Sequence, residues 1–225
     1  MPDARIQLEF ENPIQLLVSV ILSAQCTDVR VNQVTPTLFA RFPDVGALAH
    51  AELAEVERLI RTCGLHRAKS KAIISAARAI LAEHGGVVPA SRAALEELPG
   101  VGRKTAGVVA MHLGGDFALP VDTHVRRLAY RLGWTTETDP DRVESALQQL
   151  VPRERWSEAH HLLIWHGRRT CTARSPACHR CVVSKLCPRI GVAVPRRALS
   201  ARPRARRPTD RPRSRHEAED PLHWK

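Results

Sequence analysis

The sequence predicts an all-α fold, and two observations support this prediction. Segments with apolar residues at helical spacing recur along the chain, and residues that cap or stop helices bound them. Alternating strand patterns joined by hairpin turns are absent from the sequence. With 225 residues, the chain can bury a sizeable core.

The first predicted helix is expected to be central and buried. Asn12 and Pro13 provide an N-cap and a proline at the first helical position, and the helix runs to about Ala24. This segment is apolar nearly all round, which is typical of a helix surrounded by others. Asp28 is expected to cap a second helix to about residue 40, with Pro36 as a kink or break.

Further helices follow at regular intervals. Gly85 and Gly86 are a stop signal for one of them, and Ser91 is expected to cap a short turn that ends at Pro99. The predicted spans are 52–61, 68–83, 103–113, 122–132, 140–150 and 156–169.

The charge of the chain points to a polyanionic partner. The formal net charge is +11 and the pI is near 10.2. Residues 195–225 contribute +6 of this charge and the rest +5. Proline and arginine dominate there, so we expect residues 191–225 to be a disordered basic tail, either inert or with non-specific affinity for DNA.

No segment reads as a signal peptide or a membrane span. The best apolar stretch, Ile14 to Ala24, contains polar residues and is too short to cross a bilayer. We therefore expect a reducing intracellular compartment and no contact with a membrane. There, the six cysteines are expected to be ligands or free thiols rather than disulfides.

Residues 98–106, LPGVGRKTA, predict a helix–hairpin–helix. Glycines at alternate positions permit positive φ and a close approach of the backbone to a ligand. The amides of this turn and of the following helix start would form an anion site for a phosphate. The alternative is a glycine-rich connector. A Walker loop is excluded, because Arg103 separates Gly102 from Lys104.

Lys104 and Asp122 are the candidate catalytic residues. A positively charged lysine in the first turn of a helix interacts unfavourably with the helix dipole, so its presence there suggests a functional role. It could pair with a DNA phosphate, or desolvation and the helix end could yield a neutral amine that forms a Schiff base. Asp122 could simply cap the next helix, or its carboxylate could stabilise a positively charged sugar.

Four cysteines predict a metal site, with the spacing C-x6-C-x2-C-x5-C. Zinc and a [4Fe–4S] cluster both use four thiolates, and a single tight wrap favours the cluster. The expected ligands are Cys171, Cys178, Cys181 and Cys187. Cys26 and Cys63 are expected to be small buried residues outside this set.

These features together resemble the endonuclease III family of helix–hairpin–helix DNA glycosylases and abasic-site lyases. The resemblance extends from about Leu8 to Pro188, and the basic tail has no counterpart in it. It is carried by the hairpin with its lysine, the Val-Asp-Thr-His stretch at 121–124 and the cysteine spacing. Residues 22–25, LSAQ, and the Gly-Leu pair at 64–65 add to it.

The resemblance implies two helical domains that flank a cleft. Residues 13–118 would form a six-helix domain that contains the hairpin. Residues 119–190, with 1–12, would form the iron–sulfur cluster domain. Lys104 would then face Asp122 across the cleft.

The implied function is that of a bifunctional glycosylase of base-excision repair. The enzyme would flip an oxidised pyrimidine out of the duplex, remove it and nick the abasic site by β-elimination. Related glycosylases that act on ultraviolet dimers or alkylated bases are the alternative enzyme class. A DNA-binding module without catalysis is the alternative outside enzymes.

The resemblance also assigns partners and residues. The implied partner is damaged double-stranded DNA, bound by a monomer in the bacterial cytoplasm at the nucleoid, and the implied cofactor is a [4Fe–4S] cluster on the four cysteines. His160, His161 and His166 are interpreted as packing or surface residues. The expected DNA contacts are Gln25 and Leu65, which fill the gap left by the flipped base, and Gly100, Val101, Gly102, Arg103 and Arg174.

Overall fold

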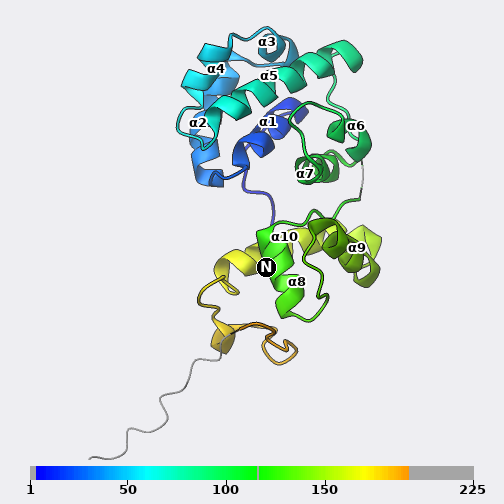
Figure 1. Ribbon diagram of the computed structural model, residues 1–225. Helices are drawn as coiled ribbons and strands as arrows, with labels where there is room; N and C mark the ends of the chain where they lie inside the picture. Colours follow the sequence, from blue (N-terminus) through cyan, green and yellow to red (C-terminus); the bar gives the residue numbers. More distant parts are fainter. Residues whose placement is uncertain (1–3, 116, 193–225) are drawn as a thin grey trace, which may run out of the picture. The chain divides into compact units, whose positions relative to one another are not determined.

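The computed structural model describes residues 4–115 and 117–192, and its regular elements there are ten α-helices and two 3₁₀ helices, without a strand (Figure 1). Residues up to Val192 belong to one unit. The predicted basic tail lies outside the described residues from 193 onward. In the described part, no helix is long and apolar enough to cross a membrane.

Helix α1, Pro13–Ser23, is the buried central helix that the sequence predicts. The side chain of Asn12 accepts a hydrogen bond from Gln15 N and caps the helix. Every residue from Ile14 to Leu22 is buried, and α1 contacts α2, α5 and α7 (Figure 1).

Helix α2, Asp28–Arg41, begins differently from the prediction. Its N-cap is Thr27, whose hydroxyl accepts from Arg30 N, and Asp28 is the first helical residue. Thr27 has the extended backbone that a cap needs, while an acidic residue in the first turn complements the helix dipole. Pro36 lies inside α2 and does not end it, so of the predicted kink or break, the break is absent.

The remaining helices lie close to their predicted spans, with one addition. The five-residue α3, Val45–Ala49, was not predicted, and Asp44 caps it by accepting from Ala47 N. Ser91 caps the short α6 as expected. The bounds are α4 Leu53–Leu59, α5 His66–Glu83, α6 Arg92–Glu96, α7 Arg103–Leu113, α8 Thr123–Arg131, α9 Pro140–Leu150, η1 Arg153–Arg155, α10 Trp156–Arg169 and η2 Cys178–Arg180.

Two hydrophobic clusters hold these helices. The larger extends from Leu8 to Ala110 and surrounds α1. The smaller extends from Leu119 to Leu163 and unites α8, α9 and α10. Their limits fall on either side of residue 118, while the division of the chain into two domains there stays a prediction.

Candidate active site

Lys104 and Asp122 line the same cleft, whose volume is about 650 Å³. Lys104 is the second residue of α7 and is exposed. Asp122 is the N-cap of α8, and its Oδ1 accepts hydrogen bonds of 2.8 Å from both His124 N and Val125 N. The predicted capping role is therefore present, and it fixes the carboxylate at the edge of the cleft.

The two glycines of the hairpin have different roles. Gly100 has a φ of +77°, and a Cβ atom there would lie 2.4 Å from Ala72 Cβ on α5. Gly102 is extended at a φ of −87°, and a Cβ there would meet nothing within 4 Å. The expectation of a positive φ thus holds for Gly100 alone. Gly102 has no side chain to cover the backbone amides at the start of α7.

The start of α7 has the backbone donors that an anion site needs. Val101 contributes least to it, because its side chain is buried and its amide donates to Leu98 O at 3.0 Å. The first helical hydrogen bond runs from Ala106 N to Gly102 O, so the amides of residues 103–105 precede it. Since a glycine cap offers no side-chain acceptor, these amides can bind a phosphate.

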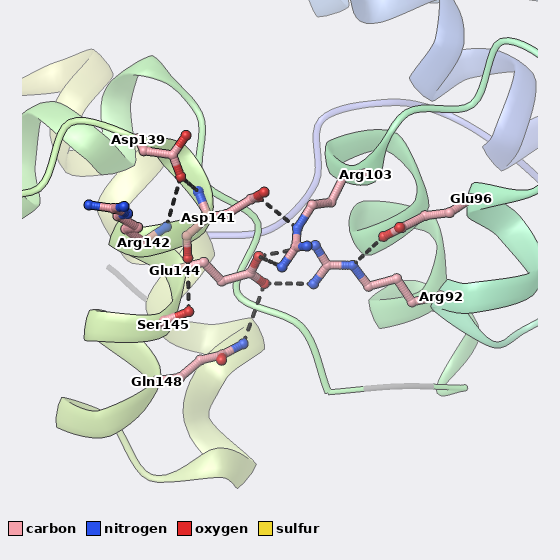
Figure 2. Close-up of polar contacts among 9 residues, drawn as sticks. All are labelled: Arg92, Glu96, Arg103, Asp139, Asp141, Arg142, Glu144, Ser145 and Gln148. Carbon is pink, nitrogen blue, oxygen red and sulfur yellow. Dashed lines mark hydrogen bonds and ion pairs between the residues drawn. The ribbon is translucent and has the colours of Figure 1, made fainter.

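Arg103 is paired with acidic residues in this structure (Figure 2). Its Nε lies 2.7 Å from Asp141 Oδ1, and its Nη2 lies 3.6 Å from Glu144 Oε2. Arg92 donates two hydrogen bonds to the same buried Glu144 and a third to Glu96. This network connects α6 and the first turn of α7 to α9. Its members on α9 lie far from the others in the sequence, so local sequence patterns could not predict it.

Gln25 and Leu65 lie in neighbouring loops. Both are exposed, and both have a positive φ, +54° and +59°. A Cβ atom at Gly64 would lie 2.9 Å from Gln25 O, which brings the two loops into contact. Gln25 also lines the cleft. Non-glycine residues with this backbone cost energy and concentrate at functional sites.

The four cysteines of the C-terminal loop surround one pocket. Cys171, Cys178, Cys181 and Cys187 all line it, together with apolar side chains of α8. Each is a free, partly buried cysteine. Four thiols that line one mainly apolar pocket are the kind of side chains that bind an iron–sulfur cluster. Arg174, the predicted DNA contact, is exposed in the loop between the first two ligands.

Two arginines of α8 hold this loop, and sequence reasoning missed both. Arg131 is buried and donates to Cys171 Sγ at 3.3 Å and to the carbonyls of residues 172 and 173 at 2.8 Å. Arg127 donates to Cys171 O at 3.0 Å and to Gly167 O at 2.9 Å. Their spacing of four residues on one helix face is the signal that could have found them.

Histidines also line the cleft, beyond the packing or surface roles predicted for them. His160 is 3% exposed, and its Nδ1 lies 2.9 Å from Pro120 O. Burial lowers the pKa of His160 to about 3. The ring of His161 packs edge-on against His160 and against His112 of α7, with both centroid distances 5.3 Å. His166 lies elsewhere, with Nε2 3.5 Å from Cys181 Sγ.

The cysteines outside the loop differ from each other. Cys63 is buried as expected, and burial raises the pKa of its thiol to about 11, with the neighbouring Cys26 contributing. Cys26 is only partly buried and lines the cleft.

Comparisons with known proteins agree with this geometry. Residues 18–153 match the HhH-GPD superfamily of base excision DNA repair proteins, and residues 171–187 match the iron–sulfur binding domain of endonuclease III. The endonuclease III of Synechocystis sp. is 50% identical over 188 residues, which cover 83% of this chain and 86% of that protein. The chain belongs to the endonuclease III family.

Further similarities support this assignment. The endonuclease III of Escherichia coli (strain K12) is 42% identical, covering 83% of this chain and 88% of that protein. A solved structure of an endonuclease III trapped as a covalent intermediate with DNA has a TM-score of 0.80 and 42% identity, and covers 84% of this chain and 89% of that one. The all-α fold and the family resemblance are confirmed. The cofactor is a [4Fe–4S] cluster. The segment that matches the cluster-binding domain begins at Cys171 and ends at Cys187, and its four cysteines line one pocket.

Proposed function

We propose that Lys104 and Asp122 are the catalytic pair of this enzyme. The chain is a bifunctional DNA glycosylase and abasic-site lyase of base-excision repair, and it acts on oxidised pyrimidines. The observation that carries the assignment is the single cleft that Lys104 and Asp122 share. A reacting sugar in this cleft would meet an amine and a carboxylate at once.

Lys104 supplies the nucleophile. Its neutral Nζ attacks C1′ of the deoxyribose, and the C1′–N bond to the base breaks, with the electron pair leaving on the base, which takes up a proton. The nitrogen loses one proton, and its lone pair then forms the C1′=N bond as the C1′–O4′ bond of the sugar ring breaks. O4′ takes up a proton, which leaves a protonated imine at C1′. Because Lys104 is exposed here, bound DNA would have to exclude water from its amine.

The imine makes the second reaction possible. Its positive nitrogen withdraws electrons from C2′, so a base can remove a C2′ proton. The electron pair of that C–H bond forms the C2′–C3′ double bond, and the C3′–O bond breaks with the phosphate as leaving group. This β-elimination nicks the strand on the 3′ side of the lesion, and water later releases Lys104 from the imine.

Asp122 stabilises the positive charge that develops on the sugar. As the glycosidic bond breaks, the sugar becomes positive, and a nearby carboxylate stabilises that charge. The hydrogen bonds from His124 N and Val125 N hold the carboxylate in place at the N-terminus of α8. Little reorganisation is then needed when charge develops.

We further propose that the partner is damaged double-stranded DNA, bound by a monomer in the bacterial cytoplasm at the nucleoid. The hairpin turn of Gly100, Val101 and Gly102 and the amides that follow would hold a phosphate. Gln25 and Leu65, in their paired loops, would fill the gap left by the flipped base. Arg174 would contact the backbone, and Arg103 could do so by exchanging Asp141 for a phosphate.

Trapping with borohydride tests the nucleophile. The wild-type chain should form a covalent adduct with duplex DNA that carries thymine glycol, because borohydride reduces the imine. Lys104→Ala should reduce trapping and nicking by about a thousandfold or more. Lys71→Ala, which removes an exposed lysine of α5, is the matched control and should trap normally at saturating DNA. An undiminished adduct with Lys104→Ala would refute the assignment.

Two further measurements define the activity. Lys104→Gln should bind the same duplex but fail to nick it, which separates an enzyme from a binding module. Nicking of oxidised, ultraviolet-damaged and alkylated duplexes should be fastest with the oxidised pyrimidine. A preference for either other lesion would reassign the substrate without changing the roles of Lys104 and Asp122.

A further inference from the structure

Pro120 is a point of contact between the helix of Lys104 and the segment that carries Asp122. A Cβ atom at Gly107, one turn after Lys104 on α7, would lie 3.1 Å from Pro120 Cγ. The backbone of α7 therefore lies directly against Pro120. Because Asp122 follows only two residues later, the position of Pro120 determines where the carboxylate stands relative to α7.

His160 holds Pro120 from a third helix, α10. Its Nδ1 lies 2.9 Å from Pro120 O, and a carbonyl oxygen can only accept a hydrogen bond. Nδ1 therefore carries the proton and donates it. His160 is 3% exposed and lines the cleft, so this hydrogen bond is made in an interior where partners are costly to lose.

Burial favours a neutral ring of His160. Asp122 and Lys104 both act on it electrostatically, with opposite signs, and His161 lies beside it on the same helix. Burial is the largest influence and lowers the pKa of His160 to about 3. With Nδ1 protonated and the ring neutral, Nε2 is unprotonated, and His160 adds no positive charge beside Asp122.

We infer that His160 is a positioning residue that sets the separation of Lys104 and Asp122 by holding Pro120 against α7. The inference rests on the proposed catalytic pair. It adds His160, which does not touch the substrate and acts on the pair through Pro120. Two helices thus fix Asp122. Backbone amides of α8 donate to its carboxylate, and His160 of α10 holds the carbonyl of Pro120, two residues earlier. A displacement of this segment by about 1 Å would cost on the order of a hundredfold in rate.

Two substitutions of His160 test this role. His160→Asn places an amide N–H donor near the position of Nδ1, whereas His160→Leu keeps bulk without a donor. Under single-turnover conditions with thymine-glycol duplex, His160→Leu should release the base about a hundredfold more slowly. His160→Asn should recover most of this loss. The Kd of both variants for an uncleavable abasic-site analogue duplex should stay within about twofold of wild type.

A pH profile separates positioning from proton transfer. His160→Asn should keep the shape of the wild-type pH–rate profile, because His160 does not titrate between pH 5 and 9 in this role. The loss of one limb of the profile would overturn the inference in favour of acid–base catalysis. Equal impairment of the Asn and Leu variants, or full activity of His160→Leu, would overturn it as well.

Gly107→Ala tests the same contact from the other side and covers the case in which His160→Leu fails to fold. The new Cβ presses on Pro120, while alanine favours the helix more than glycine does. Base release should slow at least about tenfold with Kd unchanged; an unchanged rate would contradict the inference. If wild type forms no Lys104-dependent adduct, the proposed function fails. If it forms one and the His160 variants match it, only this inference fails.

Discussion

The helices around α1 and the C-terminal cysteine loop are stabilised by different forces. Each residue of α1 from Ile14 to Leu22 is buried, so apolar burial holds that region together. In the loop, Val182 and Leu186 are 89% and 87% exposed. The loop is held instead by the donors of Arg131 and, when bound, by the cluster.

This difference matters for the candidate active site because the two residues of the proposed catalytic pair belong to different regions. Lys104 stands on α7, which packs against α1. Asp122 caps the first turn of α8, and Arg131 is the last residue of the same helix and reaches Cys171. Helix α8 therefore connects the cysteine loop with the carboxylate of Asp122. If the loop loses its structure, we expect the position of Asp122 to change more than that of Lys104.

Loss of the cluster should produce the largest contrast between the regions. Cys178→Ser removes one of the predicted cluster ligands, and the visible absorbance of the cluster should disappear. Because residues 171–192 bury little apolar surface, their amides should then exchange freely with solvent, whereas α1 should keep its protection. Hydrogen–deuterium exchange read by mass spectrometry measures both regions in one sample.

Cys26→Ser is the control, since it alters a cysteine outside the loop. It should keep the absorbance and the exchange pattern of wild type. If Cys178→Ser deprotects α1 as strongly as the loop, the two regions do not differ in the way described, and the cluster stabilises the whole chain.

Arg131→Met should have a smaller, graded effect. It leaves the carbonyls of residues 172 and 173 and Cys171 Sγ without their donor. Three partly buried acceptors without a donor should cost about 3 kcal/mol of unfolding free energy in total. Urea unfolding measures this cost, and the absorbance should decay faster under mild chelation. Arg126→Met, on the exposed face of α8, should change stability by less than about 1 kcal/mol, and equal losses would contradict the role of Arg131.

Local signals in the sequence predicted most of the helices. A proline at the first helical position marks both α1 and α9, and the spans predicted for α9 and α10 match the structure. The five residues of α3 are too few for helical periodicity to register. At α2, Thr27 and Asp28 are adjacent and both are good capping residues, so the sequence could not show which of them is the N-cap.

The site was predictable only where its chemistry is local. Lys104 and the four cysteines stand in compact motifs, and the resemblance supplied the pairing of Lys104 with Asp122. His160 could not be found in this way, because its partner Pro120 lies 40 residues away. For the same reason the resemblance suggested only a DNA contact for Arg103, and its ion pair with Asp141 of α9 could not be predicted.

Acid should weaken the α8–α10 region through His160, by a smaller amount for each pH unit than the loss of Arg131. In the unfolded chain a histidine takes up a proton as the pH falls below about 6.5, whereas native His160 stays neutral until about pH 3. The unfolded state therefore binds more protons in this window, and the free energy of unfolding falls with pH. The stabilisation is complete above pH 6.5 and declines by about 1.4 kcal/mol per pH unit below it.

Urea unfolding of wild type and His160→Asn at several values between pH 7 and pH 4 isolates this contribution. Carboxylates and the remaining histidines titrate in both proteins, so the difference between the two slopes reports His160 alone. His160→Asn should lose stability at pH 7, where the native hydrogen bond is replaced by a weaker one, and then fall less steeply as acid is added. The difference between the two stability curves should therefore shrink as the pH falls below 6.5. Parallel curves would mean that native His160 accepts a proton as readily as the unfolded chain does, which its burial against Pro120 O opposes.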